Sequence, residues 1–255
     1  VIGQAASVTA TQGVAVGKSA TAASNAVAVG TSSNTVGSGV AVGYLANSTG
    51  GGGVVIGANS TDNGGGSGVV IGNGANGGPG GSGVCIGRNT VQGSGIGVIL
   101  IGESAQVADG STQAVCIGRQ ATVTGVGTTN SVVIGPLATT SAMQTVVIGK
   151  SATCAAKTSV CIGDTTTVAS TCTNSTVIGS GASMNGTSTN SVILGSNAAI
   201  ATGGNSNICI GAGTTMNSFA NSIQIGAGGI CYAAGTVTIG AQQNSSGTNS
   251  ITIGR

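Results

Sequence analysis

Histidine and tryptophan are absent from this chain of 255 residues, and only four residues are acidic. The acids, Asp62, Glu103, Asp109 and Asp164, are spread along the chain. Paired carboxylates are therefore not expected, and a Ser-His-Asp triad or a Cys-His dyad would lack its histidine. The composition predicts a protein that is not an enzyme, with no catalytic residue and no cofactor.

Aromatic and charged residues are also scarce. They make up 1% and 4% of the chain, whereas charged residues are about 25% of typical sequences. Without bulky rings an ordinary globular core cannot be filled, so the interior must be thin and lined by Val, Ile and Ala. Helices are not expected, because there are 50 glycines and no apolar period typical of a helix.

Long hydrophobic runs are missing too. The longest aliphatic run is Val98 to Ile101, far short of the roughly 20 residues of a membrane-spanning helix. The net charge is +2 and no basic cluster occurs, whereas nucleic-acid binding needs phosphate neutralisation or aromatic stacking platforms. Neither membrane insertion nor nucleic-acid binding is predicted.

The chain does contain a repeated tetrad: an aliphatic residue, a variable residue, an aliphatic residue and a glycine, as in Val54–Gly57 and Val132–Gly135. Its glycines, the anchor glycines, recur 13 to 17 residues apart, a register that composition alone would not keep. The eighteen anchors are Gly3, Gly17, Gly30, Gly43, Gly57, Gly72, Gly87, Gly102, Gly118, Gly135, Gly149, Gly163, Gly179, Gly195, Gly211, Gly226, Gly240 and Gly254.

Each tetrad predicts a short strand, because alternation with period two marks a strand with one buried face. We expect the first and third tetrad residues, such as Val84 and Ile86, to point into the core. A second strand is expected after the glycine, where small and apolar residues two positions apart share one face. These residues are Ala20, Ala105, Ala121, Ala152 and Ala182, followed by Val107, Val123, Cys154, Met184 and Ile200.

A repeat of this kind predicts one coil with two short strands and two turns. Two buried aliphatic residues contribute about 3–6 kcal/mol per coil, whereas ordering about fifteen residues costs roughly 20 kcal/mol. A lone coil therefore cannot fold, and the coils must stack. The predicted fold is all-β, a parallel β-solenoid of about 18 coils of 13–17 residues with two short strands per coil, and residues 1–255 form a single repeat array.

The middle residue of the tetrad is expected to point away from the core of its own chain. It is apolar on coil after coil in the central part of the sequence, and such a stripe would be a large exposed patch on a monomer. We therefore predict that this stripe forms an interface between chains around a threefold axis. The predicted interface residues are Val55, Val70, Cys85, Leu100, Cys116, Val133, Val147, Cys161, Val177, Ile193 and Cys209.

The later repeats carry a more specific motif. Asn130–Gly135, Asn190–Gly195 and Asn249–Gly254 resemble the N-S-V-A-I-G repeat of YadA-like heads, which belong to trimeric autotransporter adhesins. Gly17–Ala22 is similar to the G-x-x-A-x-A continuation of that family. The resemblance implies a left-handed parallel β-roll, a homotrimer and adhesion to host surfaces or matrix. Repeats of phage and virus fibres look similar as well.

Seven cysteines are present, and we expect most of them to be reduced. Cys85, Cys116, Cys161 and Cys209 occupy the middle of their tetrads, two or three coils apart. At about 4.8 Å per coil they would lie roughly 10–14 Å apart, too far for a disulfide. No C-x-x-C pair occurs, so no metal site is predicted.

Most charges occupy one place in the repeat. Because seven of the ten charged residues follow an anchor glycine directly, we expect them on one solvated corner with weak pairs worth under about 1 kcal/mol each. These residues are Lys18, Arg88, Glu103, Arg119, Lys150, Asp164 and Arg255.

The expected function is a structural or adhesive segment of a trimeric surface fibre, at the cell surface or outside the cell. Its candidate receptors are cell-surface glycans and matrix proteins. The alternative is a virion or phage fibre, or a capsid-associated spike, with a mainly structural role. An ice-binding solenoid would need a regular Thr-x-Thr ladder, and Thr236–Thr238 does not extend into one. The chain opens inside a tetrad and shows no stalk or anchor, so we expect it to be part of a longer protein.

Overall fold

The computed structural model describes residues 1–64, 66–217 and 220–254. The chain divides into two compact units, Val1–Asn130 and Ser131–Arg255. No helix occurs among the described residues, and parallel sheets form a β-solenoid of about 16 turns with two strands per coil. The predicted fold class is therefore confirmed, with slightly fewer turns than the expected eighteen coils.

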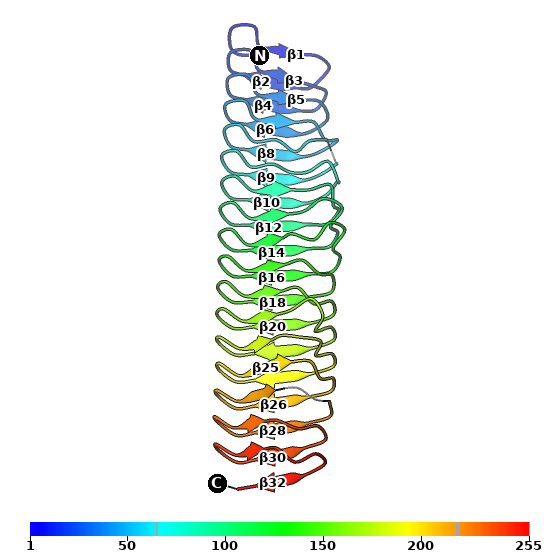
Figure 1. The fold of residues 1–255 in the computed structure, drawn as a ribbon. Coiled ribbons are helices and arrows are strands. Elements are labelled where there is room, and N and C mark those ends of the chain that lie inside the picture. The colour runs from blue at the N-terminus through cyan, green and yellow to red at the C-terminus, as the bar shows by residue number, and fades with distance from the viewer. Residues whose placement is uncertain (65, 218–219, 255) are drawn as a thin grey trace. The chain divides into compact units, whose positions relative to one another are not determined.

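The tetrads of Val1–Asn130 form its first sheet (Figure 1). Each strand pairs in parallel with the strand of the next coil, so that equivalent tetrad residues are partners, as Cys85 is of Leu100. Ile2 adds a single bridge to Val16 before the first full strand. The strands are β2 (Val14–Val16), β4 (Val27–Val29), β6 (Val40–Val42), β8 (Val54–Ile56), β9 (Val69–Ile71), β10 (Val84–Ile86), β12 (Ile99–Ile101) and β14 (Val115–Ile117).

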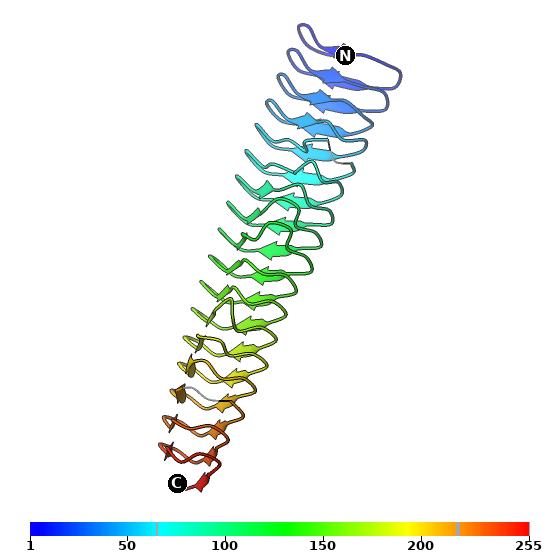
Figure 2. The same cartoon turned by 45° about the vertical axis from the view of Figure 1, so that its right-hand side comes forward.

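The second sheet of this unit is shorter and interrupted. Between its two groups of strands only single bridges continue the ladder, through Thr61 and Asn76. The turned view in Figure 2 shows that the coils are closed by a turn at each end. The strands are β1 (Ser7–Val8), β3 (Thr21–Ala22), β5 (Asn34–Thr35), β7 (Asn47–Ser48), β11 (Val91–Gln92), β13 (Gln106–Val107) and β15 (Thr122–Val123).

The unit Ser131–Arg255 repeats this plan. Its first sheet contains β16 (Val132–Ile134), β18 (Val146–Ile148), β20 (Val160–Ile162), β22 (Thr176–Ile178), β24 (Val192–Leu194), β26 (Ile208–Ile210), β28 (Ile223–Ile225), β30 (Val237–Ile239) and β32 (Ile251–Ile253). Its second sheet contains β17 (Thr139–Thr140), β19 (Thr153–Cys154), β21 (Thr167–Val168), β23 (Ser183–Met184), β25 (Ala199–Thr202), β27 (Thr215–Asn217), β29 (Ile230–Cys231) and β31 (Asn244–Ser245). One register shift, between Ile200 and Thr202, makes a bulge in β25.

The anchor glycines form the corner that follows each tetrad. Gly87 has a φ of 142° and Gly102 a φ of 138°, which side chains rarely adopt. A Cβ on Gly87 would also overlap the backbone carbonyl of Gly102 in the next coil. Two residues further on, the chain takes the left-handed conformation again, at φ 55° in Ser104. The corner therefore needs glycine for both its conformation and its close stacking.

The tetrads face the opposite way from our expectation. Every predicted interface residue is buried in the core of its own chain, with 0–1% of its surface exposed. The first and third tetrad residues lie outside, as Ile99 and Ile101 do at 37% exposure each. The interface prediction is therefore wrong for all of its members: Val55, Val70, Cys85, Leu100, Cys116, Val133, Val147, Cys161, Val177, Ile193 and Cys209.

The physical reason for this orientation is the narrow interior. A coil of 13–17 residues holds two short strands facing each other, and a small or variable side chain fits between them more easily than two columns of Val and Ile. A shift of one residue in phase moves every side chain of a strand to the other face. The second strands were predicted in the correct phase, because Ala105, Val107 and their equivalents Ala121, Val123, Ala152, Cys154, Ala182, Met184 and Ile200 are buried.

The residue before the tetrad also points inward, and in Ser131–Arg255 it is polar. Ser175 Oγ accepts a hydrogen bond from the Ser191 backbone N–H at 3.2 Å, and Ser191 Oγ accepts one from Asn207 N–H at 3.1 Å. The same contact links Ser175 N–H to Ser159, Ser222 N–H to Asn207 and Thr236 N–H to Ser222. This buried polar ladder joins six successive coils side chain to backbone.

The asparagine of the Asn-Ser motif has a separate role. Asn174 and Asn190 have φ values of 57° and 55°. Asn is among the few residues that enter the left-handed region at low cost. The pair therefore combines a turn residue with a ladder residue, which explains the motif in local physical terms.

Candidate functional site

The most extensive candidate surface is the outside of the first sheet. It consists of the first and third tetrad residues, which we call the outer aliphatic face. In Val1–Asn130 its more exposed members are Ile56 at 39% and Ile86, Ile99 and Ile101 at 37% each. In Ser131–Arg255 they are Ile178, Leu194, Ile225 and Ile239, at 36–38%.

The outer aliphatic face is regular because of the ladder beneath it. Ile86 and Ile101 are register partners in β10 and β12, and adjacent strands lie about 4.8 Å apart. Neighbouring side chains therefore cover part of one another and leave about a third of each exposed. No charged residue occupies a first or third tetrad position in the described chain. In each unit the face is a flat, uncharged patch of Val, Ile and Leu.

The charged corner lies beside this face, directly after the anchor glycines. Arg88 and Glu103, on successive coils, form an ion pair with both side chains well exposed. It is the one ion pair found among the described residues, and exposed pairs contribute little to stability. Arg255 lies outside the described residues. The corner therefore carries scattered charges rather than a binding cluster.

Asp62 is the exception among the acids, because its carboxylate is buried. Its oxygens accept hydrogen bonds from the Thr49 backbone N–H at 2.7 Å, from Ser48 Oγ at 3.0 Å and from Gly50 N–H at 3.2 Å. Gly53 leaves the space for it, since a Cβ there would overlap Asp62 Oδ2. The carboxylate is used to hold the glycine-rich turn of the preceding coil, which is a structural role.

All seven cysteines are free and buried. Burial raises the pKa of Cys85, Cys116 and Cys209 to about 12 each. The neighbouring thiol of Cys154, together with burial, raises the pKa of Cys161. Thiols that stay protonated and inaccessible are poor nucleophiles and metal ligands. They act as small apolar side chains, as expected.

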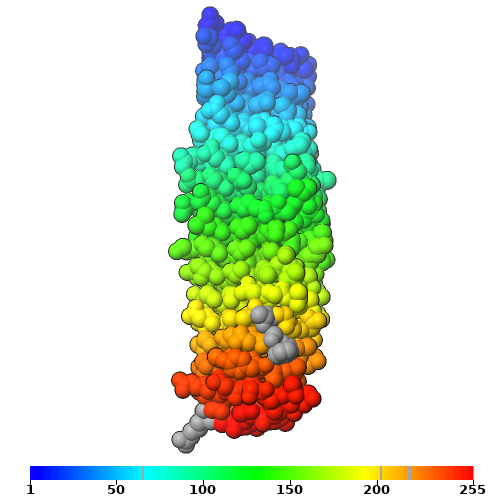
Figure 3. Space-filling model, viewed as in Figure 1, coloured from blue at the N-terminus to red at the C-terminus, as the bar shows by residue number. Residues whose placement is uncertain are grey.

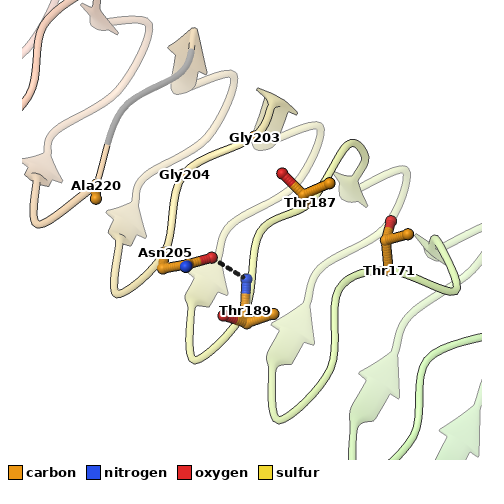
Figure 4. Close-up of a pocket in the computed structure, with 7 residues that line it drawn as sticks. All are labelled: Thr171, Thr187, Thr189, Gly203, Gly204, Asn205 and Ala220. Carbon is orange, nitrogen blue, oxygen red and sulfur yellow. Dashed lines mark hydrogen bonds between the residues drawn. The ribbon is translucent and has the colours of Figure 1, made fainter.

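A shallow depression lies over the turns that follow β21, β23 and β25 (Figure 4). The Asn205 side-chain carbonyl accepts a hydrogen bond from the Thr189 backbone N–H at 3.1 Å. Thr171, Thr187, Gly203, Gly204 and Ala220 complete the lining. The lining has hydroxyl and amide groups but no charge and no described aromatic ring, so it offers weak polar contacts only.

Other features of the described chain carry no chemistry. No group of three or more His, Cys, Asp or Glu side chains that could hold a metal ion is present in it. It also has no helix of the length and apolarity needed to cross a membrane. On the face drawn in Figure 3, the coloured surface of each unit shows no deep hollow.

Comparison with known proteins adds no identification. No protein-family model matches the chain, and no curated protein sequence is significantly similar to it. The resemblance to YadA-like heads therefore depends on the motif residues alone.

Two features were missed in the sequence, and each left a signal there. The inward residues of one coil match in size seven positions apart, as Leu100 matches Val107 and Ala15 matches Ala22. The residue before the tetrad is small or polar throughout its first and second halves, which fits an inward position. The depression left no such signal, because it depends on the bulge in β25.

Proposed function

We propose that this chain is a non-enzymatic segment of a surface fibre and that it assembles with copies of itself through the outer aliphatic face. The observation that carries the proposal is the continuous, uncharged exposure of Val and Ile on the first sheet of each unit. Exposed apolar patches larger than a few hundred Å² mark interaction surfaces. The proposed function is to form, and to space, a multivalent surface structure.

A second copy of the chain is the partner that fits best. The face is flat and repeats with the strand spacing, so an identical face matches it coil for coil. Burying a side chain such as Ile101 further contributes on the order of 1 kcal/mol, and many coils contribute together. The Asn-Ser motif, similar to that of trimeric autotransporter adhesins, favours three copies in a left-handed roll. This arrangement replaces the middle tetrad residues of our prediction by their neighbours.

Adhesion is the role that the resemblance favours for this segment. The turns around Thr171, Thr187 and Asn205 offer shallow uncharged contacts, and contacts of this kind gain affinity through repetition along a fibre. Cell-surface glycans and matrix proteins are the proposed receptors. The location is then the cell surface or the exterior.

The alternative is a virion or phage fibre with a spacing role. One observation favours it: all seven cysteines are reduced and buried. Free thiols are ordinary in proteins that assemble in a reducing compartment. Binding of the isolated assembly to glycans or matrix proteins separates the two, since a purely structural segment binds neither.

Sedimentation of the purified chain tests the assembly. The wild-type chain is expected to sediment as a trimer, and Ile101→Glu, which places a charge on the outer aliphatic face, is expected to shift it toward monomer. Gln106→Glu is the matched control, because Gln106 is exposed on the second sheet. A monomeric wild-type chain at high concentration, or equal assembly of both variants, would contradict the proposal.

A further inference from the structure

Four Asn-Gly sequences occur in the chain, at Asn63, Asn73, Asn76 and Asn185. Asn-Gly is the pair most open to intramolecular attack on the asparagine side chain, because glycine has no Cβ to hinder the approach of its nitrogen. The backbone nitrogen of the glycine is the nucleophile. Its hydrogen-bonding state therefore decides which of the four pairs can react in the folded chain.

Two of the four glycine nitrogens are held in the ladder between coils. The Gly74 N–H donates to the Ala58 carbonyl at 2.9 Å, and the Gly77 N–H donates to the Thr61 carbonyl at 2.8 Å. Attack by either nitrogen would first require the coils to separate locally, which adds a free-energy barrier.

The Asn63-Gly64 pair is held in a different way. The Gly64 N–H makes a long contact of 3.4 Å with Asp62 Oδ1. The Asn63 side-chain amide donates to the Asn76 side-chain carbonyl. Both the nucleophile and the carbon that it would attack are thus restrained, although less firmly than in the ladder pairs.

The Asn185-Gly186 pair has neither restraint. Asn185 follows β23 and both residues are exposed. The Gly186 N–H and the Asn185 side chain have no hydrogen-bond partner among the described residues. Gly186 has a φ of 76°, in a turn that glycine adopts easily.

We propose that Asn185 is a site of spontaneous covalent modification in the folded protein. The Gly186 nitrogen bonds to the side-chain carbon of Asn185, and the side-chain nitrogen leaves as ammonia after proton transfer. Water then opens the five-membered imide at either carbonyl, which yields aspartate or isoaspartate. The net reaction exchanges an amide for a carboxylate, consumes one water and releases one ammonia, without any enzyme or oxidant.

The reaction changes the surface of the depression in Figure 4. Thr187, which lines it, is two residues from Asn185, and the Gly186 carbonyl accepts a hydrogen bond from the Thr171 hydroxyl. A carboxylate would appear on an otherwise uncharged rim. In the isoaspartate product the longer backbone would also displace the Gly186 carbonyl from Thr171. Old and new copies of the chain would therefore differ at this surface.

Peptide mapping by mass spectrometry tests the site. The folded chain is incubated at mildly alkaline pH, and the acid formed at each Asn-Gly pair is followed over time. Asn73 is the internal control, because it is exposed as Asn185 is and differs in the hydrogen bond of its glycine. We expect Asn185 to react at least about ten-fold faster than Asn73 and Asn76 in the folded chain.

In denaturant the four pairs are expected to react at rates within about three-fold of one another, because the ladder is gone. The variant Asn185→Gln is expected to remove the fast modification without altering the other sites. A folded chain in which Asn185 reacts no faster than Asn73 would overturn the proposal. So would a folded chain left unmodified at Asn185 over a period that modifies the denatured chain.

Discussion

Two regions of Val1–Asn130 have the same strands and the same corners but different interiors. The early coils contain alanine at the middle tetrad position, in Ala15, Ala28 and Ala41. Their anchor glycines, Gly17, Gly30 and Gly43, are 13 residues apart. These coils hold the smallest interior in the unit.

The later coils of the same unit hold larger side chains. Cys85, Leu100 and Cys116 occupy the same inward position, and the last two of their repeats span 15 and 16 residues, from Gly87 to Gly102 and on to Gly118. Longer turns allow the two sheets to enclose more volume. The outer Val and Ile residues stay nearly constant in both regions, so coil length adjusts the inside while the outside is kept.

The corner is common to both regions, so damage to it should be severe in both. Gly30→Ala and Gly87→Ala each bring a Cβ against the next anchor glycine and force a strained φ. We expect each to destabilise the unit by more than about 4 kcal/mol, measured by urea denaturation. Gly51→Ala is the control, because nothing lies within 4 Å of the added Cβ. If either corner variant were as stable as this control, the close stacking of the corners would be wrong.

Core substitutions should have opposite signs of volume in the two regions. Leu100→Ala leaves a cavity and is expected to cost about 2–5 kcal/mol. Ala28→Leu overfills a narrow coil and is expected to cost about 1–3 kcal/mol or more. Urea midpoints measure both. The reciprocal changes at the exposed Ile101 should be nearly neutral in the monomer, and tolerance of Ala28→Leu would show that coil length does not limit the interior.

Alkaline pH should affect the two regions unequally, since the residues before Cys85 include no cysteine. The pKa of Cys116 is about 12, raised by burial from an ordinary value near 9. Its stabilising contribution is complete below about pH 9 and is lost as the pH rises toward 12, by about 1.4 kcal/mol per pH unit. Urea midpoints at neutral and alkaline pH should fall less for Cys116→Val than for the wild type. Identical pH dependence would show that this thiol is not buried.

The buried polar ladder gives a smaller test, on Ser131–Arg255. Ser175→Ala removes the acceptor of the buried Ser191 N–H, and we expect a loss of about 1–2 kcal/mol. Ser180→Ala is the matched control, because Ser180 is exposed, and it should stay within about 0.5 kcal/mol of wild type. Equal urea midpoints for the two variants would remove the ladder from the account of stability.

The fold could be predicted from the sequence because the repeat is almost purely local. The spacing of the glycines determines the coils, and a lone coil cannot fold. The phase of the first strand could not be derived from alternation, which defines two faces without saying which is inside. Gln224 and Thr238 at the middle position favoured the wrong phase, since polar residues are usually exposed.

The structure buries both of these side chains, and two of their atoms, Gln224 Oε1 and Thr238 Oγ1, have no hydrogen-bond partner among the described residues. The better evidence lay in pairs of inward residues, such as Ile193 with Ile200, whose sizes match across the coil. The outer aliphatic face was overlooked for a related reason. A constant Val or Ile is ordinarily a core residue, and here constancy accompanies exposure.

Thiol reactivity tests the central claim, the inward orientation of the middle tetrad residues, most directly. Cys85, Cys116, Cys161 and Cys209 are natural reporters at that position, and all are buried. At a dilution where the chain is monomeric, they should be unreactive toward a maleimide until the chain is denatured. Ile86→Cys, one residue from Cys85 and 37% exposed before substitution, should react at once. Rapid labelling of the four natural cysteines in the folded monomer, with Ile86→Cys protected, would contradict the account.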